Sequence, residues 1–343
     1  MPPDVVEQQA PAAAVAVADI VGLRQRGLLD RLFASQAFWV TIALALMVAV
    51  MSWQFPNAFG TSENFYNITR NFSFIGIMAL GMTAVIITGG IDLSVGSVVG
   101  VVGIVFGLIM QAGYHWAWAV GAGLLTGFAF GLFNGLLITA VGLPPFVVTL
   151  GTLSIARSAA TVLSQNKIIY QFGPYADSFF GLFGGSTFGI DNSMWLLVLM
   201  TIGFGTVLFS TRWGRHLYAI GGNEHAARLT GVPVDWVKVT AYVFCSVAAA
   251  IGAIMILGWI GSANNALGTG YELRVIASTV IGGANLMGGE GGAYGAFIGA
   301  ALIEVIRNSL LMAGVDSNWQ GIFVGAFIIL AVLLERVRGR KRE

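Results

Sequence analysis

The sequence predicts an all-α, polytopic integral membrane protein with about ten transmembrane helices. Of its 343 residues, 57% are apolar and 10% are charged, whereas a soluble domain averages about 25% charged residues. Mean hydropathy is +0.82, and the chain contains 47 glycines. This composition excludes an ordinary soluble globule, a disordered chain, a nucleic-acid binder with a basic surface and a disulfide scaffold.

The N-terminal segment lacks the basic start of a signal peptide, because residues 1–20 contain Asp4, Glu7 and Asp19 but no Lys or Arg. We expect residues 1–21 to form a disordered tail rich in Ala and Pro. The next segment, 22–36 (GLRQRGLLDRLFASQ), has the pattern of an amphipathic helix lying at the membrane surface.

Ten apolar stretches are long enough to cross a bilayer core, which takes roughly 20 helical residues. Glycines interrupt the blocks 70–111 and 273–311, so helix ends are hardest to place there. The spans predicted within a membrane domain of 37–336 are 38–54, 70–89, 94–111, 117–140, 146–164, 193–211, 237–258, 273–288, 291–311 and 319–335.

An even number of spans places both chain ends on the same side of the membrane. With the N-terminus inside, twelve of the 17 basic residues fall on inside segments, including the basic tail 337–343. Outside segments carry Arg70, Lys167 and Arg274. This asymmetry predicts that both termini are cytoplasmic. The inside residues are Arg24, Arg26, Arg31, Arg212, Arg215, Arg228, Lys238, Arg336, Arg338, Arg340, Lys341 and Arg342.

Glycines recur every fourth residue on two predicted spans. Small residues on one stripe let helix backbones approach closely inside a membrane. We therefore interpret both stripes as packing surfaces rather than as sites. They consist of Gly123, Gly127, Gly131 and Gly135, and of Gly291, Gly295 and Gly299.

Two short segments share the pattern Gly-Gly-x-Asp/Asn-Leu-x-x-Gly: GGIDLSVG at 89–96 and GGANLMGG at 282–289. A glycine pair can end one helix, and Asp92 or Asn285 can cap the next. Paired interruptions in the two halves of a membrane protein point to a transport pathway. The candidate pathway residues here are Gly89, Gly90, Asp92, Ser94, Gly282, Gly283 and Asn285.

Several intramembrane polar residues have both a structural and a functional interpretation. Asp92 is either a helix cap or a proton-coupling carboxylate. Glu304 and Arg307 are spaced to form a structural ion pair. One helical face carries four polar residues that either line the pathway or hold helices in register. These four are Ser154, Arg157, Ser158 and Thr161.

Three long motifs resemble the permease subunits of ribose/xylose/arabinose-type ABC importers. They are GMTAVIITGGIDLSVGSVVG (81–100), GRHLYAIGGNEHAARLTGVPV (214–234) and VIASTVIGGANLMGGEGGAYGAFIGA (275–300). The resemblance runs from about residue 38 to 335 and leaves out the N-terminal tail. It implies an importer in which two permease copies enclose the pathway, a soluble binding protein delivers a sugar, and cytoplasmic ATPase subunits drive alternating access.

The inside segment 212–236 reads independently as a short helix, with Asn223 as N-cap and with Gly231 and Pro233 as stops. Composition alone favours a solvated loop helix. In the family that this chain resembles, the matching element is the coupling helix, which fits a groove on the ATPase. The resemblance assigns that role to Gly222, Asn223, Glu224, Ala226, Ala227, Arg228 and Gly231.

The outside loops 165–192 and 259–273 carry exposed aromatic and polar residues. These residues suit either docking of a binding protein or anchoring at the membrane interface. They are Lys167, Tyr170, Phe172, Tyr175 and Asp177, and Trp259, Asn264, Asn265, Tyr271 and Glu272.

The sequence offers no site for chemistry of its own. None of the three lysines follows a glycine, so the chain lacks the Gly-Lys-Ser/Thr of a P-loop and ATP hydrolysis is expected on a separate subunit. Cys245 is the one cysteine, and the three histidines have no metal-ligand spacing. We expect no cofactor, no metal and no nucleic-acid partner.

The predicted function is therefore that of a permease subunit in the bacterial inner membrane. Acting as a homodimer, it would import a monosaccharide or a similar small polar solute. Its partners would be an ABC ATPase, a periplasmic or extracytoplasmic binding protein and membrane lipid. The first alternative is an ion-coupled secondary transporter using Asp92 or Glu304, and a gated channel is a more distant one.

Overall fold

The computed structural model describes residues 35–316 together with 319, 321–322 and 325–326. Seven helices in this part are long and apolar enough to cross a membrane. They are α3 (Gln36–Gln54), α4 (Ser62–Ile87), α6 (Trp116–Thr139), α7 (Pro145–Ser164), α9 (Asn192–Ser210), α12 (Val234–Ile260) and α14 (Ala293–Met312).

Two shorter helices, α5 (Val95–Gln111) and α13 (Tyr271–Ile281), fall on two further predicted spans. The predicted span 319–335 lies almost entirely outside the described residues. The predicted tails 1–21 and 337–343 lie outside them as well, as does nearly all of the surface helix 22–36. The count of ten spans and the orientation of the termini therefore stay predictions.

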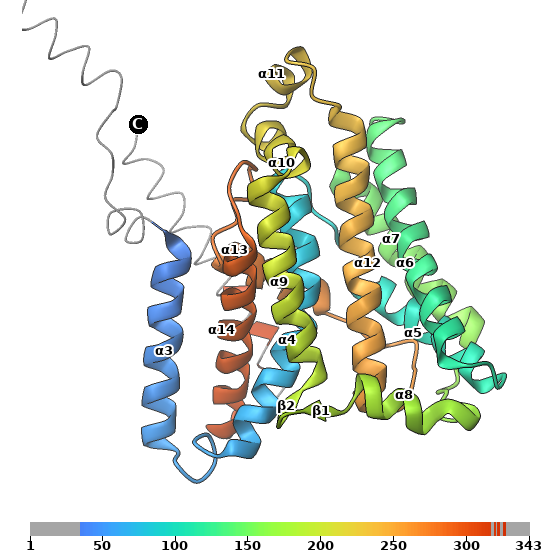
Figure 1. Ribbon diagram of the computed structural model, residues 1–343, viewed down its shortest axis with the longest axis vertical. Helices are drawn as coiled ribbons and strands as arrows, with labels where there is room; N and C mark the ends of the chain where they lie inside the picture. The colour runs from blue at the N-terminus through green and yellow to red at the C-terminus, as the bar shows by residue number, and fades with distance from the viewer. Residues whose placement is uncertain (1–34, 317–318, 320, 323–324, 327–343) are drawn as a thin grey trace, which may run out of the picture.

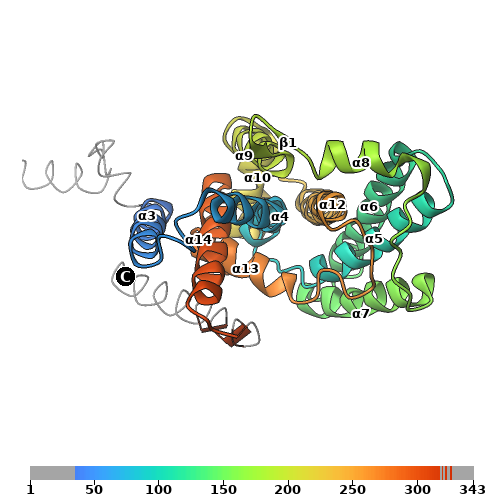
Figure 2. The same cartoon turned by 90° about the horizontal axis from the view of Figure 1, so that it is seen from below.

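Helices α4 and α12 form the centre of the bundle. They pack against each other, while α6 packs on α12 and α14 packs on α4. Helix α3 stands at one edge and α6 and α7 at the other (Figures 1 and 2). In the apolar 18-residue stretch of each helix, 89% of the residues of α4 and 67% of those of α12 are buried, against 6% for α3. Other helices therefore enclose α4 and α12, whereas α3 is mostly uncovered.

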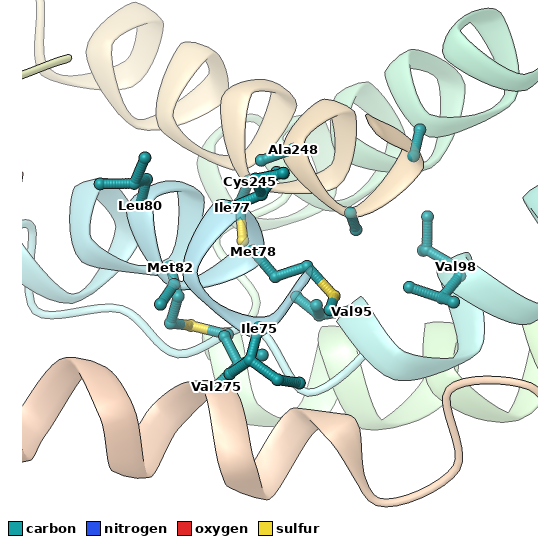
Figure 3. Close-up of a cluster of buried hydrophobic side chains, with 14 of the residues drawn as sticks. Ile75, Ile77, Met78, Leu80, Met82, Val95, Val98, Cys245, Ala248 and Val275 are labelled. Carbon is teal, nitrogen blue, oxygen red and sulfur yellow. The ribbon is translucent and has the colours of Figure 1, made fainter. Parts of the chain in front are cut away.

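The bundle core is built largely of aliphatic and sulfur-containing side chains. Figure 3 shows Ile77 and Met78 of α4 beside Cys245 and Ala248 of α12. Gly81 allows this approach, because a Cβ atom added there would lie 2.8 Å from the Cα of Cys245. The close approach of α4 and α12 therefore depends on Gly81, a glycine that lies outside the two predicted stripes.

Short elements occupy the two ends of the bundle. One end carries η2 (Gly173–Tyr175), α8 (Ala176–Phe183) and a hairpin of β1 (Ser186–Thr187) and β2 (Ile190–Asp191). The opposite end carries α10 (Arg212–Gly222) and α11 (Glu224–Leu229), as Figure 1 shows.

The hairpin is a small departure from the all-α prediction. Ser186 pairs with Asp191 and Thr187 with Ile190. Phe188 and Gly189 between them have φ values of 55° and 75°. Positive φ at both central residues is the geometry of a type I′ turn. Strands of two residues are too short to leave an alternating hydrophobic pattern.

The glycine stripe of α6 packs against α12. A Cβ atom on Gly131 would lie 2.6 Å from the Cα of Val243, and one on Gly135 would lie 2.8 Å from the Cα of Val239. In the second stripe, Gly299 packs against the backbone of Ser278 in α13, and Gly295 packs against Gly282, the residue that caps this helix. Gly291 departs from the prediction, because it precedes α14 and has a φ of 150°.

Candidate translocation and coupling sites

Both Gly-Gly segments interrupt the helices as predicted. Helix α4 ends at Ile87 and α5 begins at Val95, while α13 ends at Ile281 and α14 begins at Ala293. The glycine that takes the left-handed conformation differs between them. It is the first of the pair in one break (Gly89, φ +77°) and the second in the other (Gly283, φ +103°).

The two breaks meet in space. The backbone N–H of Gly289 donates to the carbonyl oxygen of Ile87 at 2.9 Å. Gly221, the penultimate residue of α10, packs on the same point, since a Cβ atom there would collide with both of these backbone groups. The element that leads into the predicted coupling helix therefore touches both interruptions.

Asp92 is fully buried and holds the start of α5, two residues before the N-cap residue Ser94. Its Oδ1 accepts from the backbone N–H of Ser94 at 2.9 Å and from the Ser94 hydroxyl at 2.6 Å. Asn134 of α6 donates to the same hydroxyl at 3.0 Å and accepts from Thr152 of α7 at 2.6 Å. This network ties the first break to two helices. Asp92 Oδ2 has no hydrogen-bond partner among the described residues.

Asn285 does not cap the following helix. Its Oδ1 accepts from the N–H of Met287 at 2.8 Å, within a turn closed by Gly288. Helix α14 begins eight residues after Asn285, with Gly292 as its N-cap residue. The longer non-helical stretch of the second break separates the asparagine from the helix that it was expected to cap.

The predicted short helix is α11, and a further helix, α10, precedes it in segment 212–236. Asn223 caps α11 by accepting from the N–H of Ala226 at 2.9 Å. Gly231 follows the helix with a φ of +84°. Gly222 is the last residue of α10, and the other predicted coupling residues, apart from Asn223 and Gly231, lie within α11.

Ion pairs fix α11 to the start of α12. Arg228 pairs with Asp235 at 2.7 Å, and Lys238 pairs with Glu224 at 2.5 Å. The hydrogen bond with Asp235 raises the pKa of the Arg228 guanidinium. Because exposed pairs stabilise weakly one at a time, this arrangement orients α11 more than it strengthens the fold.

Two exposed apolar residues extend this surface and were missed in the sequence. Leu229 is 76% exposed and Trp236 is 66% exposed. The sequence did contain a signal for them, because large apolar side chains are unusual in a segment that is otherwise polar. Aromatic and aliphatic side chains of this kind act as anchors in protein interfaces.

The polar face of α7 meets the segment between α12 and α13. Arg157 donates from Nη1 to the carbonyl oxygens of Asn265 and Leu267 at 2.6 and 2.9 Å. Thr161 accepts from the Asn265 side chain at 3.0 Å. Ser154 and Ser158, by contrast, are exposed. The predicted face thus combines a register-holding contact with two exposed hydroxyl groups, of which that of Ser154 donates to the Leu150 carbonyl oxygen at 3.4 Å.

Segment 261–270 of the predicted outside loop 259–273 is largely covered by protein rather than exposed. It runs along α5, which offers it glycines. A Cβ atom on Gly107 would lie 3.1 Å from Ala263, and one on Gly100 would lie 3.0 Å from the Leu267 carbonyl oxygen. Ala263 and Leu267 are buried. Non-helical backbone at this depth fits the rule that it must be covered by protein or line water.

Glu304 joins two arginines instead of one. It pairs with Arg307 as predicted, at 2.5 Å, and also with Arg274 of α13 at 2.7 Å. Arg274 was counted with the outside segments, at the start of the predicted span 273–288, and this second pairing was not predicted. The pairing leaves Glu304 with two neutralising partners, which favours the structural interpretation.

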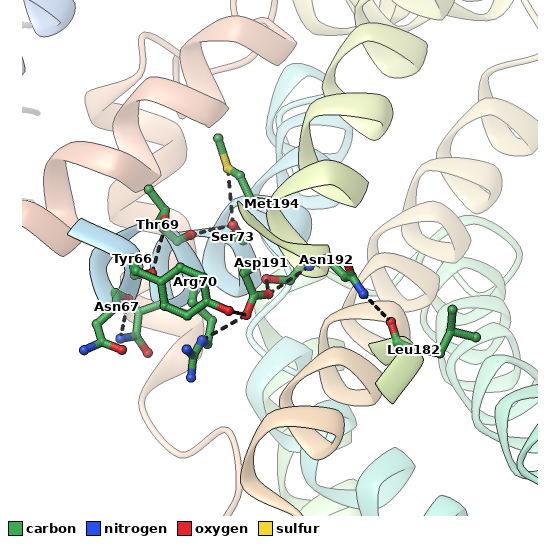
Figure 4. Close-up of polar contacts among 11 residues, drawn as sticks. Tyr66, Asn67, Thr69, Arg70, Ser73, Leu182, Asp191, Asn192 and Met194 are labelled. Atoms are coloured by element: carbon green, nitrogen blue, oxygen red, sulfur yellow. Dashed lines mark hydrogen bonds and ion pairs between the residues drawn. The ribbon is translucent and has the colours of Figure 1, made fainter. Parts of the chain in front are cut away.

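A second buried ion pair lies at the end of the bundle with the hairpin. Arg70 of α4 lies 2.9 Å from Asp191 and stacks over the rings of Tyr66 and Trp259. Asp191 Oδ1 also accepts from the N–H of Ser193 at 2.9 Å and so caps α9. Figure 4 shows this cluster joining α4 to the hairpin.

The described residues contain no group of three or more His, Cys, Asp or Glu side chains able to hold a metal ion. Residues 64–332 match the family model described as branched-chain amino acid transport system / permease component. No solved structure matches the chain.

Curated relatives include "Probable ABC transporter permease protein y4mJ" of Sinorhizobium fredii, 38% identical over 88% of this chain and 89% of that protein. "Ribose import permease protein RbsC" of Escherichia coli K12 is 37% identical over 86% of this chain and 92% of the relative. "Autoinducer 2 import system permease protein LsrD" of Enterobacter sp. 638 is 35% identical over 77% and 82%.

The match therefore covers most of the chain, including both helix breaks, α10 and α11, and the bundle that holds them together. The chain is a multi-pass membrane protein and belongs to this family of ABC importer permeases.

Proposed function

We propose that this chain is the translocating subunit of an ATP-driven, binding-protein-dependent importer of a monosaccharide or a similar small polar solute. Two copies would enclose the pathway and alternate between inward and outward access. The ribose import permeases among the relatives support a sugar as the solute. ATP hydrolysis would take place on a separate cytoplasmic subunit.

The observation that carries the proposal is the contact of Gly221 with both helix breaks. It supplies a continuous backbone path from the exposed helix α11 to the interrupted spans. An ATPase that moves α11 would act through α10 on Ile87 and Gly289 together. The proposal includes ten spans with both termini in the cytoplasm. The extracytoplasmic binding protein would then dock on the side of α8 and the hairpin.

The test is reconstitution of the chain in liposomes with its ATPase and binding protein. Uptake should require ATP and all three components. A double substitution, Glu224→Ala with Gly231→Ala, should abolish the stimulation of ATP hydrolysis without reducing membrane insertion, because it removes the Lys238 ion pair and the turn that ends α11. Glu63→Ala, at an exposed position in the first turn of α4, is the matched control for surface mutation.

The second candidate is an ion-coupled secondary transporter, which the buried and unpaired Oδ2 of Asp92 favours. Uptake driven by an ion gradient in liposomes that contain this chain alone would support it. Full stimulation of ATP hydrolysis in the double variant would contradict the coupling role of α11.

A further inference from the structure

A cavity of about 1260 Å³ lies at the end of the bundle that carries α10. Its walls are the first residues of α3, residues 201–210 of α9, Tyr218 of α10 and parts of 282–295 around the second break, whereas none of residues 89–96 of the first break lines it. Figure 1 shows that α3 stands apart from α9 and begins at the end of the bundle nearer α10. Cavities for small molecules usually measure about 300–1,000 Å³, so this one has room for a larger occupant.

The cavity walls combine uncovered apolar side chains with an unpaired charge. Ile202 and Phe209 of α9 are 63% and 90% exposed. Glu290, which follows the turn of the second break, is exposed, and its carboxylate has no hydrogen bond or ion pair with any other described residue. Tyr218, by contrast, already donates to the carbonyl oxygen of Gly291 at 2.8 Å. The occupant that complements these walls is therefore amphipathic and carries positive charge.

The described part of the chain begins at the rim of this cavity. Ser35, the first described residue, lines the cavity, and Gln36 Nε2 donates to the carbonyl oxygens of Val280 and Ile281 at 3.3 and 3.1 Å. The backbone of Ser35 is extended, with a φ of −77° and a ψ of 128°, so α3 does not continue toward the N-terminus. Residues 1–34, which lie outside the described residues, are thus joined to the bundle at the cavity itself.

The sequence directly before Ser35 has the character that the walls require. Arranged as a helix, residues 22–34 place four large apolar side chains within an arc of about 140°, and two arginines seven residues apart border that arc. Such a face binds either a membrane surface or a protein groove. The direct connection at Ser35 gives the segment an effective concentration in the millimolar range at the cavity, which favours the groove. The apolar residues are Leu28, Leu29, Leu32 and Phe33, and the arginines are Arg24 and Arg31.

We propose that segment 22–34 docks in this cavity, with its apolar face on α9 and with Arg24 or Arg31 paired to Glu290. The cavity is bounded by α10 and by the second break, so the docked segment would brace two of the elements that meet at Gly221. The inference concerns the permease chain alone and holds for any solute that the chain carries.

Two other occupants fit the walls less well. A phospholipid would bring its phosphate to walls whose unpaired charge, that of Glu290, is also negative. The C-terminal tail 337–343 is basic, but Val337 is its one large apolar residue, so this tail cannot cover both Ile202 and Phe209. Segment 22–34 supplies the apolar face and the positive charge together.

Disulfide cross-linking of the full-length permease in lipid nanodiscs tests the docking. The four apolar positions of the segment are changed to Cys one at a time, each together with Phe209→Cys, and the native Cys245 stays because it is fully buried. After oxidation with copper phenanthroline, at least one pair should cross-link within a single chain at least fivefold more than the same position paired with Val207→Cys. Val207 is the matched control, because it is exposed on α9 but does not line the cavity.

Charge reversal tests the pairing with Glu290 in the variant that cross-links best. Arg24→Glu with Arg31→Glu should reduce the cross-link at least threefold, and adding Glu290→Arg should restore it to within twofold. Glu63→Arg, at an exposed position in the first turn of α4, is the matched control and should not restore it.

Three results would count against the inference. Cross-linking with Phe209→Cys that never exceeds the Val207→Cys control, as a lipid-filled cavity would give, would overturn the docking. A cross-link formed only between two chains would overturn it as well. A cross-link unchanged by charge reversal would overturn the pairing with Glu290. Neither measurement uses ATP or transport, so both outcomes are independent of the proposed function.

Discussion

The N–H of Gly289 donates to the carbonyl oxygen of Ile87 at 2.9 Å, so the second helix break binds the end of the helix that precedes the first. Gly221 of α10 packs against both groups. Three segments that are remote in sequence thus share one backbone contact. Since packed backbones shift between discrete arrangements rather than deform gradually, a displacement of α10 must move both breaks or neither.

Gly221→Ala should uncouple ATP hydrolysis from transport. The added methyl group would overlap backbone atoms of Ile87 and Gly289, and no change of rotamer can relieve a clash with backbone. We expect at least a tenfold loss of ATP-driven uptake in reconstituted liposomes. Gly203→Ala, on α9, is the matched control, because no atom lies within 4 Å of its added Cβ. Equal uptake in both variants would contradict the role of this contact.

The breaks themselves were predictable from the sequence, but their meeting was not. Gly-Gly followed by Asp or Asn is a local signal, and glycine in the left-handed conformation explains it at Gly89 and Gly283. The bond between Gly289 and Ile87 joins backbone groups, which leave no trace in residue type.

Gly131→Ala should destabilise the contact between α6 and α12. Its Cβ would lie 2.6 Å from the Cα of Val243 and 2.7 Å from the Tyr242 carbonyl oxygen, and overpacking of this kind costs about 1–3 kcal/mol. The measurement is the free energy of unfolding of the purified permease in detergent micelles.

Gly121→Ala is the control on the same helix. Nothing lies within 4 Å of its added Cβ, so the higher helix propensity of alanine should leave stability unchanged or raise it by up to about 1 kcal/mol. Equal losses in the two variants would mean that the stripe of α6 is not a packing surface.

Asp191→Ala should weaken the end of the bundle that carries the hairpin. The change leaves Arg70, with a side chain 14% exposed, without its ion-pair partner and removes the cap of α9. Breaking a buried ion pair costs about 3–5 kcal/mol. Thermal unfolding of the permease in detergent should show a clear drop in Tm. Asp177→Ala, at an exposed position on α8, should not change it, and a Tm equal to wild type in both variants would argue against the ion pair.

The surroundings of Arg157 show where sequence reasoning stops. Arg157 was identifiable because an arginine within an apolar span requires a polar partner. Glu272 was placed in an outside loop, because segment 261–270 has the polar composition of a loop. Glu272 packs on Gly96 of α5, and the backbone of Leu267 packs on Gly100; which segment covers such glycines is visible only in three dimensions. The pairing of Arg274 with Glu304 was missed as well, because it depends on how α13 and α14 lie against each other.

Asp92→Asn separates the two interpretations of the buried carboxylate. An asparagine keeps the Oδ1 that accepts from the N–H and hydroxyl of Ser94, and its amide N–H₂ places donors where Oδ2 now lacks a partner. If Asp92 acts only as a cap, the variant should fold and support ATP-driven uptake within twofold of wild type, with no dependence on a pH gradient across the liposome.

Asp92→Leu is the companion variant, because leucine fills the space but cannot cap. Loss of a cap costs about 0.5–2 kcal/mol, so its Tm should fall below that of Asp92→Asn. Uptake driven by a proton gradient in liposomes with this chain alone, present in wild type and abolished by Asp92→Asn, would identify a proton-coupling group. Because asparagine preserves the cap and removes only the titration, such a result could not be attributed to misfolding of the break.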